Sequence, residues 1–394
     1  LQGYLIIGLD RSAKGDELQV DLPPEDHCPH GGQVSRRVHQ YSEKPSRILW
    51  SFLGQRPVWI LVRRRRLWCT TCRRAFTQNL PGVGRKQRMS VLAQVQLLEA
   101  LTERSFASLK RGMGVSYGRA RRVLLRLKVP WRDWEELVGG EGPIHLGIDE
   151  HSFRGRDMMV TITCLSQRKL VAILPDDRKA TLKAALLAMP EQVRRRVVAV
   201  CIDGKAGFRA VVKGVIPQAK VVLDHFHLIQ DANRRLDETR RLEQSESKKA
   251  LYRWPLVQNR EDLTVKQSQQ LNKMLAEYPT IAAQYWVKEK LRGLYRCPDI
   301  GAAERHLELI LTNCEAADDV ETVLWGRWLR DWGREILAYF DVRITNGYTE
   351  GCHTKFKLIK RISYGFRNAE VYIRKMMLGF LPVNSLHLQP HILT

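Results

Sequence analysis

The sequence lacks several features that define common classes of protein. Its 394 residues contain only eight cysteines, too few for a small scaffold held together by disulfides. No apolar run approaches the roughly 20 residues that span a bilayer, and the first residues lack the basic start and apolar core of a secretion signal. Internal repeats and low-complexity segments are missing as well. We therefore expect a cytoplasmic protein that does not bind membranes.

Acidic residues are also in deficit. Asp and Glu number 42 against 65 Lys and Arg, which gives a formal net charge of +23. This surplus of positive charge attracts polyanions, so we expect nucleic acid as the partner. A hydrophobic fraction of 44% and a charged fraction of 27% are typical of folded proteins. The length predicts two to four domains, at roughly 100–200 residues each.

The residue pattern changes several times along the chain. Short β-rich runs with turn residues come first, helical spacing follows, and apolar runs then alternate with turns and helices before a long charged, Leu-rich stretch. We expect an α/β protein in five segments: a β-rich module over 1–82, a helical domain over 88–138, the first part of an α/β core over 143–226, a helical insertion over 227–340, and the end of the core with a tail over 341–394.

Two acids end apolar runs in the predicted core. Asp149 ends the run 144–149, and Asp203 ends the run 197–203. Open α/β sheets place their sites at the carboxyl ends of strands, and Mg²⁺ prefers carboxylates together with water and substrate oxygens. A single acid at such a place is also typical of a solvated loop. However, both acids have cations nearby that would hold phosphates, such as Arg154.

A third acid, Glu350, begins a late helix. The turn signal Asn346-Gly347 precedes it, and helical spacing continues to about residue 378 with an interruption near 363–365. Several basic residues, with no acid among them, follow Glu350. A DNA strand that crosses the helix would contact a basic side chain at each turn. They are Lys355, Lys357, Lys360 and Arg361.

The helical domain has the pattern of a helix-turn-helix. Residues 105–111 are followed by glycines in the turn and by Ser116 as the cap of a second helix. One face of that helix is apolar, and another carries Arg119, Arg122 and Arg126, which suit DNA phosphates or guanine edges. A generic pair of amphipathic helices has the same pattern.

Three strings carry a resemblance to a known family. They are GIDEHSFR at 147–154, VLDHFH at 222–227, and TNGYTEG at 345–351 with the basic residues after it. In these strings, and over nearly its whole length, the chain resembles the ISL3 family of bacterial insertion-sequence transposases, which belong to the DDE superfamily. The resemblance implies a ribonuclease H-like catalytic core, with Asp149 on strand one, Asp203 on strand four and Glu350 on a late helix. These acids would hold two Mg²⁺ ions, with Mn²⁺ as a substitute.

The second acid has a competitor. Asp224 also ends a predicted strand, the fifth, but strand four is the neighbour of strand one in the implied fold, so we favour Asp203. The family's histidine-containing motif would place Asp224 and His227 beside the site. His227 would then contact the scissile phosphate or a DNA base, unless it caps or packs against the following helix.

The N-terminal module resembles a zinc ribbon. Cys28 and the pair Cys69 and Cys72 are its two halves. Family members usually have a second cysteine where this chain has Gly31. Either His30 or His27 substitutes as the fourth ligand, or the site has lost its metal. The run Arg63, Arg64, Arg65 and Arg66 before the second half is interpreted as a strand that grips phosphates, or as a basic edge that resists aggregation.

The expected function follows from these parts. A transposase of this kind would bind the terminal inverted repeats of its element in double-stranded DNA, associated with the nucleoid. It would act as a homodimer or higher assembly, because both ends must be held together. A metal-dependent DNA nuclease without strand transfer, or a transposase-derived regulator that only binds DNA, are the alternatives.

Overall fold

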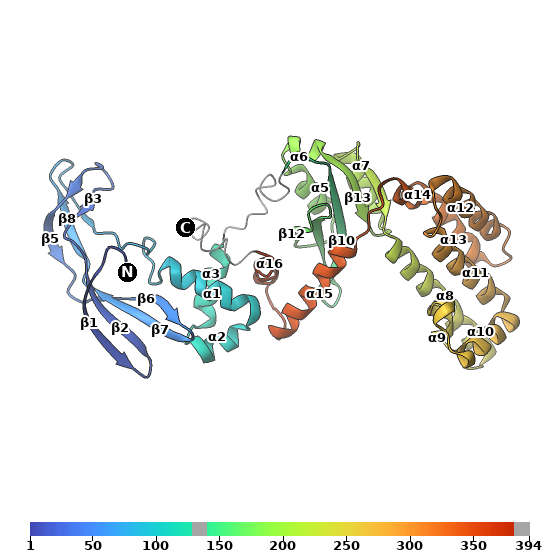
Figure 1. The fold of residues 1–394 in the computed structure, drawn as a ribbon, viewed down its shortest axis with the longest axis horizontal. Helices are drawn as coiled ribbons and strands as arrows, with labels where there is room; N and C mark the ends of the chain where they lie inside the picture. Colours follow the sequence, from blue (N-terminus) through green and yellow to red (C-terminus); the bar gives the residue numbers. More distant parts are fainter. Residues whose placement is uncertain (128–139, 382–394) are drawn as a thin grey trace. The chain divides into compact units, whose positions relative to one another are not determined.

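The computed structural model describes residues 1–127 and 140–381, which belong to two compact units (Figure 1). One unit contains Leu1–Val129 with Thr354–Thr394, and the other contains Pro130–His353. We call them the N-terminal unit and the core unit and describe each by itself. No helix in the described ranges is long and apolar enough to cross a membrane.

A five-stranded mixed sheet forms the centre of the core unit. Its strands are β10 (Ile144–Arg154), β11 (Asp157–Cys164), β12 (Lys169–Leu174), β13 (Val197–Ile202) and β14 (Lys220–Leu223). Their order in the sheet is β12-β11-β10-β13-β14; β10, β11 and β12 pair antiparallel, whereas β13 and β14 run parallel to β10. The predicted alternation of apolar strands with turns and helices is confirmed, and the sheet opens with three antiparallel strands.

The composition of the strands explains their position. β13 has the sequence VVAVCI and is buried at every residue except Val198, as expected for a parallel strand covered on both faces. The linking helices are α5 (Lys179–Leu187), α6 (Glu191–Arg195) and α7 (Ala206–Val215). Leu182, Leu186 and Phe208 from α5 and α7 are fully buried in the core cluster with the sheet.

The chain between His225 and Val342 is helical, with no strand in this described stretch. Its elements are α8 (His225–Ser247), α9 (Trp254–Val257), a 3₁₀ turn (Arg260–Asp262), α10 (Val265–Glu277), α11 (Pro279–Leu294), α12 (Ile300–Glu315), α13 (Val320–Asp331) and α14 (Gly333–Val342). The predicted helical character of this stretch is confirmed. Two late helices follow, α15 (Gly347–Ile362) and α16 (Ala369–Leu378), and the interruption between them lies where it was predicted.

The N-terminal unit begins with strands, as the sequence predicts. They are β1 (Leu5–Ser12), β2 (Gly15–Asp21), β3 (Asp26–His27), β4 (Val34–Ser35), β5 (Arg37–Tyr41), β6 (Ser46–Leu53), β7 (Arg56–Val62), β8 (Arg65–Cys69) and β9 (Arg74–Thr77). One sheet has the order β1-β2-β7-β6, a second has the order β5-β8-β9, and β3 pairs with β4. The second sheet carries Cys69 at the end of β8.

Three helices follow the strands: α1 (Val91–Glu103), α2 (Phe106–Met113) and α3 (Tyr117–Arg126). Ser90 caps α1 as its Oγ accepts a hydrogen bond from Ala93 N at 3.0 Å, and Gly114 ends α2 in the left-handed conformation. Ser116 occupies the N-cap position of α3, although its side chain makes no capping bond. The part of the predicted helical domain over 128–138 lies outside the described residues.

The chain after residue 353 belongs to the N-terminal unit. α16 packs against α1 and α3. Its Lys375 is buried and donates from Nζ to Arg104 O and to Ser363 Oγ, both at 2.7 Å. The predicted segment 341–394 is therefore shared between the two units, and α15 contributes residues to both.

Candidate active site

Three acids follow matched positions on three neighbouring strands. Ile148 of β10 pairs with Ile202 of β13, which pairs with Leu223 of β14. Asp149, Asp203 and Asp224 are the next residues. Since adjacent strands lie roughly 4.8 Å apart, this register puts three carboxyl groups side by side at one edge of the parallel part of the sheet.

Asp149 is not the last residue of its strand, so that detail of the sequence prediction is wrong. β10 continues to Arg154, because beyond Ile148 it loses its parallel partner β13 but stays paired with β11 as far as Asp157. Asp149 therefore sits inside a strand and is 3% exposed. Arg154 lies at the exposed end of the β10–β11 hairpin, where Asp157 is 3.8 Å away.

The beginning of α15 is clamped onto the same edge of the sheet. The backbone N–H of Asn346 donates to Asp224 Oδ1 at 3.2 Å, and its side-chain amide donates to Ile148 O at 3.2 Å. A Cβ at Gly147 would lie 2.5 Å from Thr349 Oγ1 and 2.6 Å from Asn346 Oδ1, so only glycine permits this approach. The contacts bring Glu350, in the first turn of α15, to the acids of the sheet.

His227 joins this group from the first turn of α8. The ligand atoms of Asp224, His227 and Glu350 all lie within 4.8 Å of one another. His227 Nε2 is 3.4 Å from Asp149 Oδ1 and 4.0 Å from Asp224 Oδ2. Asp224 and His227 therefore lie beside Asp149 and Glu350, as expected from the sequence, and the His227 ring faces their carboxylates.

The pKa values reflect a crowded negative site. Burial lowers the pKa of His227, but the hydrogen bond and charge of Asp149, with the charges of Asp224 and Asp203, outweigh it and raise the pKa to about 9. Burial, then the charges of Glu150 and Asp149, raise the pKa of Asp203 to about 6. Burial also raises the pKa of Asp224. A cation at this place would relieve the repulsion, and a protonated His227 supplies one positive charge.

Asp203 and Asp224 differ in access. Asp224 is 1% exposed, and its Oδ1 accepts from Asn346 N. Asp203 is half-buried and lines a cavity of about 400 Å³. The other residues of this cavity include His227, Arg234, Arg235 and Trp328.

Sequence reasoning missed a chain of polar residues behind Asp149. His353 Nδ1 lies 3.5 Å from Asp149 Oδ2, and His353 Nε2 lies 2.9 Å from Thr161 Oγ1. The same hydroxyl lies 2.9 Å from His151 Nδ1. His353 follows Glu350 by three residues, so the helical spacing that puts both on one face was the available signal.

The other cations near the acids are held by carboxylates. Lys205 forms ion pairs with Glu150 and with Asp177, the latter at 2.7 Å. Arg209 pairs with Asp331 at 2.5 Å, and its second partner is the buried Glu335. These two cations stabilise the surroundings of the site and are not presented to a ligand.

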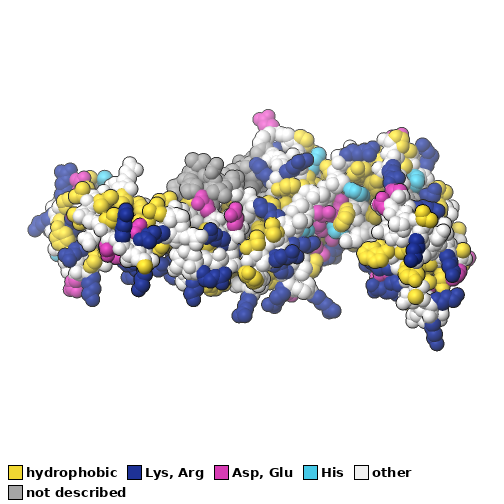
Figure 2. All heavy atoms as spheres, turned by 60° about the horizontal axis from the view of Figure 1, so that its bottom comes forward, with side chains coloured by type: hydrophobic (Ala, Val, Ile, Leu, Met, Phe, Trp, Pro, Cys, Tyr) yellow, Lys and Arg dark blue, Asp and Glu magenta, His cyan; other side chains and the backbone are white. Residues whose placement is uncertain are grey.

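The basic residues of α15 lie in the N-terminal unit and are mostly exposed. Lys357 and Arg361 are exposed, whereas Lys360 is half-buried. Lys355 donates from Nζ to Gly379 O and lies 4.4 Å from the centre of the Phe380 ring. On the face drawn in Figure 2, Lys and Arg side chains are spread over both units.

The arginine run at 63–66 does not act as one surface. Arg65 is 7% exposed, and its guanidinium donates to both carboxylate oxygens of Asp21 at 2.8 and 2.7 Å. This side chain is therefore turned inward and is not presented to DNA in this structure. Arg64 is half-buried, whereas Arg63 and Arg66 are exposed.

Three thiols meet in the N-terminal unit. The sulfur atoms of Cys28, Cys69 and Cys72 lie within 4.8 Å of one another, with Cys28 and Cys72 at 3.5 Å. Backbone and side-chain hydrogen bonds from Cys72 are the main cause that lowers the pKa of Cys69 to about 7. This favours the thiolate, the form that binds metal.

The fourth position of this cluster belongs to Gly31. A Cβ at Gly31 would lie 3.9 Å from Cys69 Sγ, whereas His27 and His30 are exposed and do not join the three thiols in the described structure. The structure therefore does not bring either predicted histidine to the three thiols. The turn in which Gly32 N donates to Cys28 O points position 31 at the sulfur atoms.

Comparisons with known proteins place the chain in a family. A family model described as a transposase, of the ISL3 type, matches residues 146–376. The transposase for insertion sequence element IS1001 of Bordetella parapertussis is 25% identical, and the alignment covers 96% of each chain. The transposases for insertion sequence element IS1557 of two Mycobacterium tuberculosis strains are 23% identical, and those alignments cover 63% of each chain.

Proposed function

Because the chain belongs to the ISL3 family of insertion-sequence transposases, we propose that it cuts DNA at the ends of a mobile element and joins those ends to target DNA. The observation that carries the proposal is the shared register of Asp149, Asp203 and Asp224 on three strands, together with the clamped helix that brings Glu350 to them.

The core that holds these acids has a ribonuclease H-like organisation. Three antiparallel strands followed by two parallel ones, in the order β12-β11-β10-β13-β14, support this assignment. Asp149 then lies on the first strand, Asp203 follows the fourth, and Glu350 lies on a late helix.

Asp149, Asp203 and Glu350 would hold two Mg²⁺ ions, with Mn²⁺ as a substitute. The donor set fits, since hard cations prefer carboxylate oxygens, and the pKa values of Asp203 and Asp224 are raised first by burial and further by the charge of Asp149. When bound, such ions activate a water or a 3′-hydroxyl and stabilise charge on the attacking and leaving oxygens. We prefer Asp203 to Asp224 because Asp203 lines the 400 Å³ cavity, whereas Asp224 holds Asn346.

The histidines have supporting roles in this proposal. His227 lies on the wall of the cavity, where its ring would contact a phosphate of the DNA. His353 orients the Asp149 carboxylate from behind, as hydrogen-bonding partners of metal ligands commonly do.

DNA would be bound by both units. In the N-terminal unit, α2 and α3 would act as a helix-turn-helix, and the three thiols would hold Zn²⁺. The expected contacts with double-stranded DNA come from exposed or half-buried cations. Because two element ends must be held together, we expect a homodimer or larger assembly. The cations are Arg63, Arg66, Arg119, Arg122, Arg126, Arg154, Lys357, Lys360 and Arg361.

The decisive experiment uses Asp149→Asn. The variant should bind duplexes carrying the element ends as the wild type does, but should not nick them in Mg²⁺. Persistent nicking would remove Asp149 from the active site. A joining assay with precut ends separates a transposase, which joins them to target DNA, from a nuclease, which does not. A wild type that binds but never nicks would indicate a DNA-binding regulator.

A further inference from the structure

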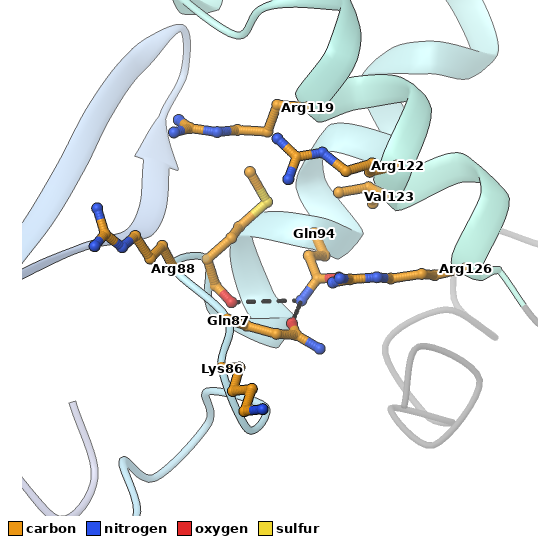
Figure 3. Close-up of a pocket in the computed structure, with 9 residues that line it drawn as sticks. Lys86, Gln87, Arg88, Gln94, Arg119, Arg122, Val123 and Arg126 are labelled. Atoms are coloured by element: carbon orange, nitrogen blue, oxygen red, sulfur yellow. Dashed lines mark hydrogen bonds between the residues drawn. The ribbon is translucent and has the colours of Figure 1, made fainter.

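A second cavity, of about 230 Å³, lies in the N-terminal unit between α3 and the segment before α1 (Figure 3). Arg119, Arg122 and Arg126 extend from α3 across the opening. Lys86 and Arg88 belong to the segment on the other side. The remaining lining residues are Gln87, Met89, Gln94 and Val123.

The lining carries five cations and no acid. None of these five side chains forms an ion pair within residues 1–127 or 140–381. Arg119 shows the consequence, since burial, then the neighbouring charges of Arg122, Arg47 and Arg88, lower its pKa. Like charges held together without a counter-ion repel one another, so a bound anion would stabilise this arrangement.

Both walls of the cavity are held in place. Gln94, which is 1% exposed, donates from Nε2 to Gln87 Oε1 at 2.8 Å and so ties the segment to α1. Leu49 N donates to Arg88 O at 3.1 Å and ties it to β6. On the opposite side, α3 is anchored by its buried apolar face, including Val123. A preformed cavity binds its ligand without the cost of ordering either wall.

Size and charge together indicate the ligand. Pockets that enclose whole small molecules usually measure roughly 300–1,000 Å³, and this cavity is smaller. Guanidinium groups are forks that match phosphate oxygens. We therefore propose that the cavity is a phosphate clamp, in which Lys86 and Arg88 act with the arginines of α3 to hold a backbone phosphate of duplex DNA. This proposal rests on the proposed DNA-binding function, to which it adds the contacts made by Lys86 and Arg88.

The phosphate clamp predicts a contact with the DNA backbone that does not depend on the base sequence. Binding to phosphates releases counter-ions, so the logarithm of the affinity falls with the logarithm of the salt concentration, with a slope of about 0.9 for each phosphate neutralised. If α3 only read bases, removing cations from the opposite wall would leave that slope unchanged.

The test compares the full-length wild type with Lys86→Gln and Arg88→Gln, both at exposed positions. Affinity for a random-sequence DNA duplex is measured by fluorescence anisotropy at several salt concentrations. We expect each variant to bind more weakly and to lose about one unit of salt slope, and Arg88→Lys to restore most of it. Lys14→Gln, which removes an exposed cation from the β1–β2 turn, is the matched control.

Four results would overturn the phosphate clamp. A loss of slope no larger than in Lys14→Gln, while the wild type binds DNA, rejects the cavity but leaves the proposed function intact. A changed preference among duplex sequences without a change of slope shows base recognition instead. A wild type that does not bind duplex DNA at all rejects both proposals. Inorganic phosphate that saturates the cavity without weakening DNA binding would identify a free-anion site and would also reject the clamp.

Discussion

The Nδ1 atom of His353 lies 3.5 Å from Oδ2 of Asp149, while His227 approaches the other carboxylate oxygen at 3.4 Å. Asp149 is thus held between two histidines on different helices, α8 and α15. His353 is buried and is in turn connected to Thr161 and His151, so its ring has a fixed position. The orientation of the Asp149 carboxylate therefore depends on α15 as much as on its own strand.

Substitution of His353 should weaken catalysis without weakening DNA binding. We expect His353→Ala to slow Mg²⁺-dependent nicking by about 10- to 100-fold and to raise the Mg²⁺ concentration needed for half-maximal rate, because Asp149 loses its orienting partner. His39→Ala, at an exposed position of β5, is the control. An unchanged Mg²⁺ requirement in a folded His353→Ala protein would show that the residue only fills space.

Gly31→Cys should complete the thiol cluster of the N-terminal unit. Its Cβ would meet Cys69 Sγ at 3.9 Å and Cys72 Cβ at 4.0 Å, which are ordinary contacts, so the new thiol would point at the other three. Four-ligand sites bind Zn²⁺ with roughly 10–16 kcal/mol, so one added thiolate should tighten binding on the order of 100-fold. The measurement is competition for Zn²⁺ with a chromogenic chelator.

His30→Cys serves as the control for this substitution. It adds a thiol one residue earlier, at an exposed position outside the cluster, and should not change the affinity for Zn²⁺. Equal affinities in the wild type and Gly31→Cys would mean that a group other than residue 31 already supplies the fourth ligand.

Local sequence patterns predicted the helices and strands of this protein better than they predicted its tertiary contacts. The apolar run of β13 and the helical spacing of α3 depend on which faces of a single element are buried, so the sequence alone predicted both elements. The contact of Asn346 with Ile148 and the ion pair of Arg65 with Asp21 depend on partners distant in the chain. No periodicity in a single segment contains that information.

The extent of β10 shows the same limit in the active site. Asp149 followed an apolar run and so was expected at a strand end, but pairing with β11 extends the strand to Arg154. The alignment of Asp149 with Asp203 depended on strand four lying beside strand one, which the family resemblance implied and the strand alternation alone did not. The choice between Asp203 and Asp224 depended on which acid lines a cavity, which a sequence does not show.

The stability of the N-terminal unit should rise in alkaline solution. Burial lowers the pKa of Lys375 from 10.5 to about 8, so folding disfavours its charged form. The cost is fully present below pH 8 and disappears as the pH rises toward 10.5, a difference of roughly 3 kcal/mol. Chemical unfolding of the wild type and Lys375→Met should show this rise only in the wild type. Parallel pH profiles would mean that Lys375 keeps an ordinary pKa.

Asp203→Asn and Asp224→Asn should separate the two candidates for the second metal ligand. Asp203 lines the cavity beside His227, whereas Asp224 is buried and accepts from Asn346 N, a bond that an asparagine oxygen also accepts. A metal ligand contributes several kcal/mol to catalysis, so we expect Asp203→Asn to slow nicking at least about 100-fold and to lose Mn²⁺ binding measured by electron paramagnetic resonance. Asp224→Asn should keep most of its Mn²⁺ binding.

The opposing argument is that the ligand atoms of Asp224, His227 and Glu350 already lie within 4.8 Å of one another. If Asp224→Asn loses Mn²⁺ and Asp203→Asn keeps it, that group is the metal site and Asp203 only shapes the cavity wall.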